Sequence, residues 1–193
     1  MTAGLILAAG ESRRMGSPKA LLDYRGETFL DRLIGLFAGC CSPVIAVLGA
    51  QAEEIRAGLR RSDEARVVEN PDFRAGQLSS MQCGLRAVPA EAERVLFTLV
   101  DHPAVSPDTL TALVVAPAAP LCIPCYGGRR GHPILFSKAL LREFLALPAG
   151  SAARDVVTRH ASDATYINVP DPGILANIDD SEAYANLLAE RGA

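Results

Sequence analysis

A cluster of basic side chains follows the first apolar segment of the chain. The apolar residues 5–7 end at the small residues 8–10, and Arg13, Arg14 and Lys19 follow in the next polar stretch. Small residues at the end of a buried strand let a ligand approach the backbone closely. Two guanidinium groups and an ammonium group beside them can neutralise a polyphosphate. The segment therefore predicts a phosphate-binding loop, and the alternative is a strand followed by a basic surface turn.

A second candidate for chemistry is Asp101, which follows the apolar run 94–100 and precedes His102. A carboxylate at the end of a buried strand is costly unless a partner neutralises it. A divalent metal ion is one such partner. The alternative is a turn or helix-capping aspartate, because Ser106 can begin a helix soon afterwards.

The spacing of the basic loop excludes two common phosphate-binding motifs. Five residues separate Gly10 from Gly16, and Lys19 comes three positions later. A P-loop has four residues between its glycines and a lysine directly after the second, and the loop does not contain GxGxxG either.

The elements that must position these residues alternate between apolar runs and amphipathic stretches. Near-continuous apolar runs at 4–8, 43–48 and 94–100 are typical of strands buried on both faces, and they predict a parallel sheet in a three-layer α/β domain. Ligands of such folds bind beyond the carboxyl ends of the strands, where the basic loop and Asp101 lie. We predict strands at 4–8, 43–48, 66–69, 94–100, 120–123, 133–136 and 165–169, and helices at 28–39, 51–60, 78–87, 106–115, 138–146, 152–160 and 180–190. Caps are expected at Thr28, Ser106 and Ser137.

The composition is that of an ordinary globular domain. The 193 residues suit one domain with a sizeable core, and 49% of them are hydrophobic. No apolar run approaches the roughly 20 residues that span a bilayer, and no secretory signal is evident. We therefore expect a cytoplasmic protein without a membrane partner.

Charge and cysteine content narrow the classes of function. A net charge of −3 argues against nucleic-acid binding, which needs a broad basic surface, whereas the local arginine pairs 13–14 and 129–130 suit a small anion.

Five cysteines, an odd number, in a chain without an evident secretory signal predict reduced thiols. Cys122 and Cys125 match CxxC, but in an extended segment they face opposite sides, which favours small buried hydrophobes over a zinc or redox pair.

Five segments resemble, in order along the chain, motifs of the nucleotidyltransferases with a glycosyltransferase-A-like fold, above all the molybdenum cofactor cytidylyltransferases and their guanylyltransferase relatives. This resemblance implies a three-layer, Rossmann-like α/β domain over residues 1–193, with a nucleotide-binding half at 1–115 and an acceptor-binding half at 116–193. The matching segments are 4–19 (LxAAGxSxRMGxxK), 70–85 (NPxxxxGxxxSxxxGL), 101–103 (DxP), 127–133 (GxxGHPxxF) and 177–182 (DIDTPE).

The resemblance also implies roles for individual residues. It assigns Arg14, Lys19 and Asp101 to catalysis, and Asp101 and Asp179 to a Mg²⁺ ion, a cation that takes few protein oxygens beside phosphates and waters. The expected nucleotide contacts are Leu7, Ala8, Ala9, Gly10, Arg13, Lys19, Asn70, Ser79, Ser80 and Gly84, and the expected acceptor contacts are His102, Gly131, His132, Pro133 and Arg154. Read from the residues alone, the segment around Asp179 is also a helix start capped by Asp180 or Ser181.

The implied reaction is the transfer of a nucleoside monophosphate from a nucleoside triphosphate to a phosphorylated acceptor, with release of pyrophosphate. Within the resemblance, Ala9 in LAAG goes with cytidine, which favours CTP, a molybdopterin acceptor and a molybdenum hydroxylase as client. The alternatives are a guanylyltransferase, a sugar-phosphate nucleotidylyltransferase, and a non-catalytic nucleotide-binding protein that delivers the cofactor.

Three residues depart from the family pattern. His102 stands where Gln is more usual, and its role is open. Ser151 replaces an Asp in the segment 150–154, which loosely resembles GDxGAR, and this leaves the identity of the acceptor open. Asn177 replaces the first Asp of DIDTPE, which weakens the charge of the expected metal site.

Overall fold

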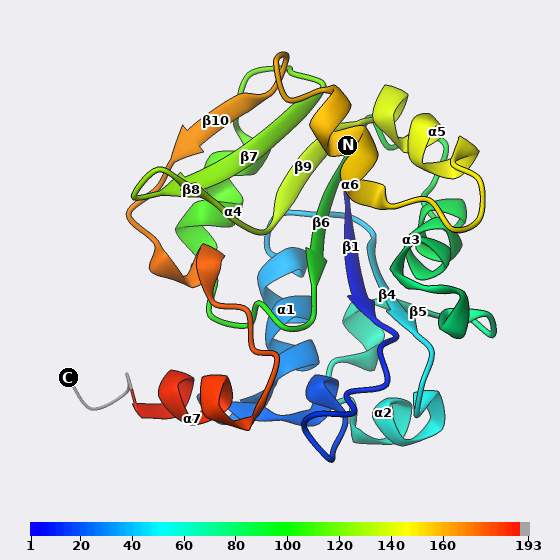
Figure 1. The fold of residues 1–193 in the computed structure, drawn as a ribbon, viewed down its shortest axis with the longest axis vertical. Coiled ribbons are helices and arrows are strands. Elements are labelled where there is room, and N and C mark those ends of the chain that lie inside the picture. Colours follow the sequence, from blue (N-terminus) through cyan, green and yellow to red (C-terminus); the bar gives the residue numbers. More distant parts are fainter. Residues whose placement is uncertain (190–193) are drawn as a thin grey trace.

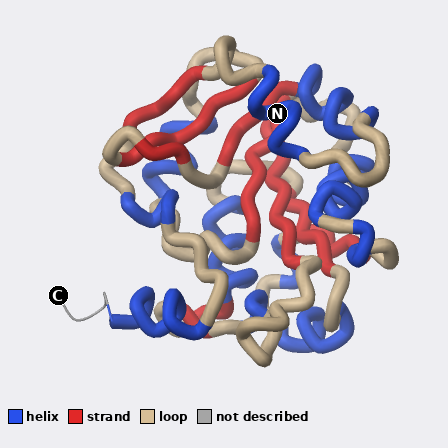
Figure 2. The backbone as a smooth tube through the Cα atoms, viewed as in Figure 1, coloured by secondary structure: helices blue, strands red, loops and turns tan. Residues whose placement is uncertain are grey.

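A central sheet of eight strands carries the fold in the computed structural model, which describes residues 1–189 (Figures 1 and 2). The strand order is β10-β7-β9-β6-β1-β4-β5, and β8 pairs with β7. The strands are β1 (Thr2–Ala8), β4 (Val44–Leu48), β5 (Arg66–Glu69), β6 (Arg94–Leu99), β7 (Leu121–Tyr126), β8 (Arg129–Arg130), β9 (Ile134–Ser137) and β10 (Thr165–Asn168). A separate two-stranded sheet pairs β2 (Asp23–Tyr24) with β3 (Glu27–Thr28).

The sheet is mostly parallel, as predicted. Strand β1 is parallel to β4 and β6, β4 is parallel to β5, and β7 is parallel to β10. Strand β9 is antiparallel to both β6 and β7. Because β9 reverses direction between them, β6 and β7 point the same way, and their carboxyl ends lie at the same edge as those of β1 and β4.

Helices cover both faces of the sheet (Figure 1). They are α1 (Phe29–Ala38), α2 (Ala52–Gly58), α3 (Gln77–Arg86), α4 (Pro107–Val114), α5 (Lys138–Ala146), α6 (Ala153–Arg159) and α7 (Ser181–Ala189), with short 3₁₀ turns η1 (Lys19–Leu21), η2 (Ser62–Glu64), η3 (Phe73–Ala75) and η4 (Pro172–Leu175).

Strand β1 shows how the layers are built. Its side chain Ile6 packs in one core cluster with Phe29 and Phe37 of α1, whereas Leu5 packs in a second cluster with Met81 of α3. Side chains alternate between the two faces of a strand, so a strand that is apolar at every position serves two cores. The three-layer α/β fold expected from the apolar runs is therefore confirmed.

All of the predicted strands and helices are present, with ends displaced by a few residues. Strands β2, β3 and β8 were not predicted, because a strand of two residues is too short to show an alternation of apolar and polar side chains. Strand β8 follows β7 through Gly127 and Gly128, whose φ angles of 55° and 77° suit a two-residue hairpin turn. The expected helix end at 190 lies outside the described residues.

Two of the three expected helix caps form. The Thr28 hydroxyl accepts a hydrogen bond from the Asp31 N–H at 3.0 Å, and that of Ser106 accepts one from the Thr109 N–H at 3.2 Å. Ser137 occupies the predicted N-cap position of α5 and also ends β9, but within residues 1–189 its side chain makes no capping hydrogen bond.

Two further expectations concern the state of the cysteine side chains and the presence of membrane-spanning helices. All five cysteines are free, and Cys122 and Cys125 are buried in β7. Within residues 1–189, every helix is too short or too polar to cross a bilayer.

Candidate active site

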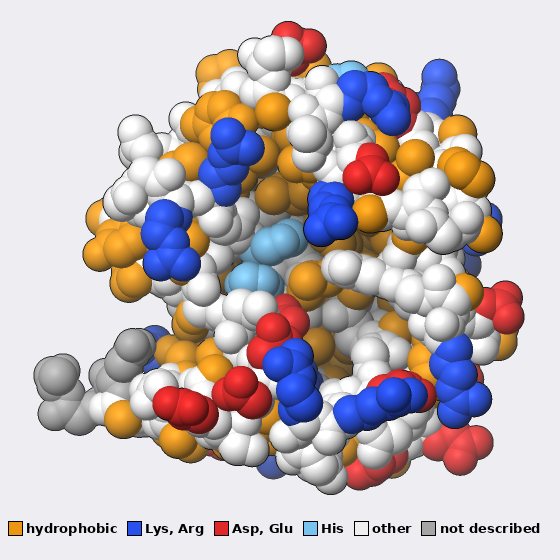
Figure 3. All heavy atoms as spheres, viewed as in Figure 1, with side chains coloured by type: hydrophobic (Ala, Val, Ile, Leu, Met, Phe, Trp, Pro, Cys, Tyr) orange, Lys and Arg blue, Asp and Glu red, His pale blue; other side chains and the backbone are white. Residues whose placement is uncertain are grey.

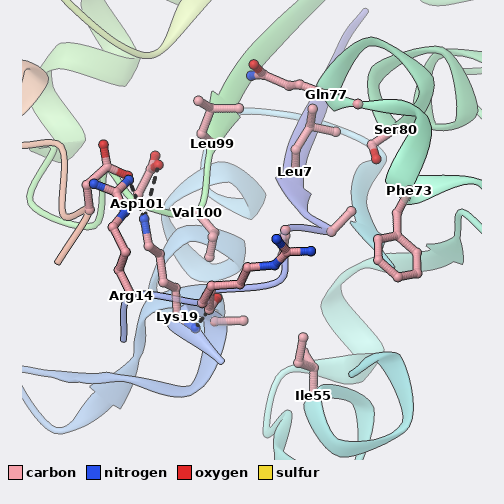
Figure 4. Close-up of a pocket in the computed structure, with 18 residues that line it drawn as sticks. Leu7, Arg14, Lys19, Ile55, Phe73, Gln77, Ser80, Leu99, Val100 and Asp101 are labelled. Atoms are coloured by element: carbon pink, nitrogen blue, oxygen red, sulfur yellow. Dashed lines mark hydrogen bonds and ion pairs between the residues drawn. The ribbon is translucent and has the colours of Figure 1, made fainter. Parts of the chain in front are cut away.

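A cavity of about 350 Å³ opens at the carboxyl edge of the sheet, where β1 and β6 end. This is the position at which open α/β sheets bind their ligands. The cavity is lined by Leu7, Ala8, Ala9, Gly10, Ser12, Arg13, Arg14, Lys19, Ala20, Ile55, Phe73, Gly76, Gln77, Ser80, Leu99, Val100, Asp101 and Asp179. Figure 4 shows Arg14, Lys19 and Asp101 on one side of it and Phe73 and Ser80 on the other.

The basic loop folds back on itself before it reaches η1. The Met15 N–H donates to the Ser12 carbonyl at 2.9 Å, and the Lys19 N–H donates to the Ser12 hydroxyl at 3.0 Å. Gly16 has a φ of 69°, a backbone conformation that glycine adopts at low cost. These bonds bring Arg14 and Lys19 to the same side of the cavity, beside the end of β6.

Two carboxylates that are far apart in the sequence meet at Lys19. Its Nζ lies 2.7 Å from Oδ1 of Asp179 and 3.9 Å from Oδ2 of Asp101. The Arg14 Nη2 lies 3.4 Å from the same Asp179 oxygen, and the Asn177 amide donates to the other at 2.8 Å. The hydrogen bond from Lys19 is the main reason why the pKa of Asp179 lies below its usual range.

The surroundings of Asp101 suit a divalent cation. Its Oδ1 is buried without a hydrogen-bond partner among residues 1–189, and burial raises the pKa of the carboxyl above its usual range. A buried anionic oxygen without a donor is costly unless a cation neutralises it. The residues 1–189 contain no cluster of three or more acidic, histidine or cysteine ligands. Asp101 and Asp179 alone would offer a divalent ion two protein ligands, which suits only a cation such as Mg²⁺ that takes much of its coordination from phosphates and water.

The opposite wall of the cavity is organised by a buried asparagine. The Asn70 amide donates to the hydroxyl of Ser79 at 2.9 Å and to that of Ser80 at 3.0 Å. The Ser79 hydroxyl turns to the carbonyls of Asp72 and Gly76, whereas Ser80 lies in the cavity wall. The Ser80 oxygen accepts from Asn70 and keeps its own hydroxyl proton, so this side chain can both accept and donate hydrogen bonds at the cavity wall.

Gly84, expected to contact the nucleotide, lies behind the cavity wall. It is buried in α3, and a Cβ there would overlap the side chain of Leu5 and come within 2.6 Å of the Val47 side chain. The absence of a side chain lets α3 approach β1 and β4. This close approach sets the depth at which Ser80 enters the cavity.

Two stacked histidines lie next to the carboxylates. The rings of His102 and His132 have centroids 4.8 Å apart, and His102 Nε2 lies 3.6 Å from Oδ1 of Asp101. Burial is the main cause that lowers the pKa of each histidine to about 4, so both imidazoles are neutral near pH 7. In the described part of the chain, the Nδ1 atom of each is buried without a hydrogen-bond partner. Figure 3 shows histidine side chains in the hollow on this face, beside acidic and basic groups.

Three arginines of the predicted acceptor-binding half lie exposed on the surface, unlike the two stacked histidines. Arg154 is exposed at the start of α6, and within residues 1–189 it makes no hydrogen bond or ion pair. Arg129 and Arg130 are exposed on β8, where the guanidinium of Arg130 stacks on the Tyr166 ring at 4.7 Å.

The comparisons with known proteins identify the family of this chain. The sequence profile of the MobA-like NTP transferase domain matches residues 4–164. The chain belongs to this family. It is therefore a nucleotidyltransferase, and the expected fold and family are both confirmed.

Curated members that resemble this MobA-like chain carry different names. The molybdenum cofactor cytidylyltransferase of Escherichia coli is 27% identical over 93% of this chain and 92% of its own length. The nicotine blue oxidoreductase of Paenarthrobacter nicotinovorans is 34% identical over 96% of this chain and 95% of its own. A probable molybdenum cofactor guanylyltransferase of Mycobacterium avium is 35% identical over 99% and 96%.

Solved structures are also similar to this chain over nearly its whole length. A homologue of Mycobacterium tuberculosis Rv0371c from Mycobacterium sp. strain JC1 has a TM-score of 0.85 and 25% identity, covering 98% of this chain and 96% of that one. Rv0371c from Mycobacterium tuberculosis H37Rv in complex with manganese has a TM-score of 0.80 and 28% identity, covering 97% and 98%.

Sequence reasoning missed several residues that line the cavity of this MobA-like domain. Ile55 enters from α2, and Leu99 and Val100 close the end of β6. No signal in the sequence marks them, because each also belongs to an apolar pattern that a core alone explains.

Proposed function

We propose that this protein transfers CMP from CTP to a phosphorylated acceptor of the molybdopterin type and releases pyrophosphate. The observation that carries the proposal is the meeting of Asp101 and Asp179 with Lys19 and Arg14 at one end of the cavity. Two carboxylates beside two cationic side chains, at the carboxyl edge of a parallel sheet, suit a metal–triphosphate complex.

The reaction joins an oxygen of the acceptor phosphate to the α-phosphorus of CTP and breaks the bond between that phosphorus and the β-bridging oxygen. Lys19 and Arg14 neutralise charge on the triphosphate and on the leaving pyrophosphate, with Arg13 as a further phosphate contact. Asp101 and Asp179 would hold a Mg²⁺ ion, which supplies additional neutralisation of phosphate charge when bound. Such chemistry depends mainly on positioning and electrostatic stabilisation.

The nucleoside is proposed to bind against the opposite wall. The backbone of residues 7–10 lets a ligand approach closely, and the Ser80 hydroxyl presents a proton to a carbonyl oxygen of a base or to a sugar hydroxyl. Gln77 and Phe73 complete that wall (Figure 4). Ala9 in LAAG supports cytidine, and the Escherichia coli cytidylyltransferase supports the same choice.

The acceptor is proposed to enter over the stacked histidines, on the side formed by residues 116–193. The neutral imidazoles of His102 and His132 suit recognition of uncharged polar groups, whereas the exposed Arg129, Arg130 and Arg154 suit a phosphate. A molybdenum hydroxylase is the proposed client of the product. The manganese complex of a structural neighbour supports a divalent ion in the same fold.

A second candidate is guanylyl transfer, which the 35% identity to a probable guanylyltransferase favours. One assay separates the candidates: pyrophosphate release with Mg²⁺ and molybdopterin cofactor, comparing CTP, GTP, ATP and UTP. We expect turnover with CTP that is lost in Asp101→Ala. Turnover with GTP instead overturns the base assignment, and binding of nucleotide without release from any triphosphate would favour a cofactor-delivery protein.

A further inference from the structure

The segment from Asp171 to Asp179, here called the 171–179 strap, connects the acceptor side of the fold to the carboxylates. Figure 1 shows it in orange to red, running from the end of β10 toward α7. Its first residue, Asp171, is 8% exposed and lies outside the cavity. Its last residue, Asp179, lies in the cavity wall.

Asp171 anchors the strap through both carboxylate oxygens. Its Oδ2 accepts hydrogen bonds from the Ser106 N–H at 2.9 Å and from the Thr109 hydroxyl at 2.7 Å, at the start of α4. Its Oδ1 accepts one from the Gly173 N–H at 2.9 Å, inside η4. A buried carboxylate with three donors is well compensated, so it fixes η4 against α4.

The middle of the strap is wedged between two loops of the site. A Cβ on Gly173 would overlap the Ala104 carbonyl, and a Cβ on Gly131 would overlap the Ile174 carbonyl. The Ile174 carbonyl also accepts a hydrogen bond from the His132 N–H at 3.0 Å. The strap therefore sets the spacing between the loop after Asp101 and the loop that carries His132, because its backbone contacts the backbone of each loop.

The end of the strap is tied to the first carboxylate. The Ile178 N–H donates to the Asp101 carbonyl at 2.9 Å, and the next residue is Asp179. A displacement of η4 moves the backbone that presents Asp179 relative to Asp101.

We propose that Asp171 is a positioning residue, which holds Asp101 and Asp179 at the separation that a divalent cation requires and seats His132 beside them through the same strap. This inference deepens the proposed function and rests on it for the identity of the cation. It assigns to Asp171 a role in metal affinity in addition to its contribution to folding.

The test is Mn²⁺ binding, followed by electron paramagnetic resonance on the full chain, with Mn²⁺ alone and with Mn²⁺ plus α,β-methylene-CTP. The variant is Asp171→Asn, which keeps the size of the side chain but replaces one accepting oxygen by a donor. The matched control is Asp31→Asn, because Asp31 is 2% exposed and accepts from the N–H groups of Arg60 and Arg61 and from the Thr28 hydroxyl, away from the cavity.

We expect the Mn²⁺ dissociation constant to rise on the order of tenfold in Asp171→Asn, as for other residues that orient metal ligands from outside the coordination shell. In Asp31→Asn it should stay within about twofold, since distant sites act independently. Melting temperatures measured alongside should fall in both variants. Equal Mn²⁺ affinities in the two variants would overturn the proposal, because loss of a buried carboxylate would then affect folding alone.

Gly173→Ala provides a second variant if Asp171→Asn does not fold, because the added Cβ would meet the Ala104 carbonyl and Asp171 Oδ1 and so displace η4, while the charge of Asp171 is kept. It too should weaken Mn²⁺ binding, and unchanged affinity in the folded variant would count against the role of the strap. The arm with Mn²⁺ alone does not depend on nucleotide. A wild-type chain that binds Mn²⁺ but no α,β-methylene-CTP would therefore refute the proposed function, whereas the comparison of the variants with Mn²⁺ alone still decides the role of Asp171.

Discussion

At the scale of the residue, Lys19 balances the charge of the site. Its ammonium contacts both Asp101 and Asp179, and its side chain is only 13% exposed. Removing it would leave the two carboxylates and the proposed triphosphate with the guanidinium groups of Arg14 and Arg13 as the remaining cations that line the cavity. In a partly buried site such unbalanced charge is far more costly than in water.

Replacing Lys19 by methionine tests this balance, since Met keeps most of the apolar stem. We expect the rate of pyrophosphate release to fall on the order of a hundredfold or more, the range seen when one preorganised charge-stabilising group is lost. The pKa of Asp179 should rise, because the Lys19 hydrogen bond is what lowers it most. Lys138→Met is the matched control, as Lys138 is the only other lysine and contacts Glu93. A similar loss of rate in both variants would contradict the assignment.

The two neighbouring serines give a second prediction at this scale. Ser80→Ala removes a hydroxyl that faces the cavity, and we expect nucleotide affinity, measured by calorimetry, to fall about fivefold, equivalent to one hydrogen bond of about 1 kcal/mol. Ser79→Ala should change it less, because that hydroxyl is turned to the carbonyls of Asp72 and Gly76. A larger effect of Ser79→Ala would reverse the roles.

At the scale of the element, α3 matters because it carries Ser80 into the cavity at a depth set by Gly84. The helix packs on β1 and β4, and Gly84 is the point of closest approach. Helix α3 begins at Gln77 behind Gly76, so the same helix start supplies several lining residues. A shift of α3 on the sheet is therefore expected to move the cavity wall against which the nucleoside is proposed to bind.

Gly84→Ala tests this packing. The added methyl group overlaps Leu5 and approaches Val47, both fully buried, so we expect a loss of about 1–3 kcal/mol in the free energy of unfolding by urea denaturation. Nucleotide affinity should fall with it as α3 moves outward. Gly39→Ala is the control, because a Cβ there lies no closer than 3.4 Å to a neighbour. Unchanged stability in Gly84→Ala would show that the core adapts without moving the helix.

At the scale of the whole molecule, the site is assembled from segments at both ends of the chain. The basic loop follows β1, Asp101 follows β6, and Asp179 precedes the last helix. A ligand that contacts all three joins parts of the chain that are distant in sequence. Binding should therefore stabilise the fold globally, because such a ligand binds only the folded chain.

This coupling predicts a ligand-dependent melting temperature. Mg²⁺ with α,β-methylene-CTP at about 100 times its dissociation constant should stabilise the fold by about 2.7 kcal/mol, which corresponds to roughly 5–10 °C for a domain of this size. EDTA, or the substitution Asp101→Asn, should remove most of the shift measured by differential scanning calorimetry. An equal shift without metal would argue that the nucleotide binds independently of the carboxylates.

The chain's local patterns determined its strands, its helices and the basic loop, because apolar periodicity and small residues act over neighbouring positions. The place of Asp101 after an apolar run marked it as a candidate metal ligand, and the resemblance added Asp179 as its partner in one site. Only the tertiary structure decided that both contact Lys19, that β9 runs antiparallel, that Gly84 lies behind the wall rather than in it, and that Asp171 anchors the strap. Each of these depends on which distant segments pack together. That packing follows from the order of strands in the sheet and from burial on both of its faces, which no short stretch of sequence encodes.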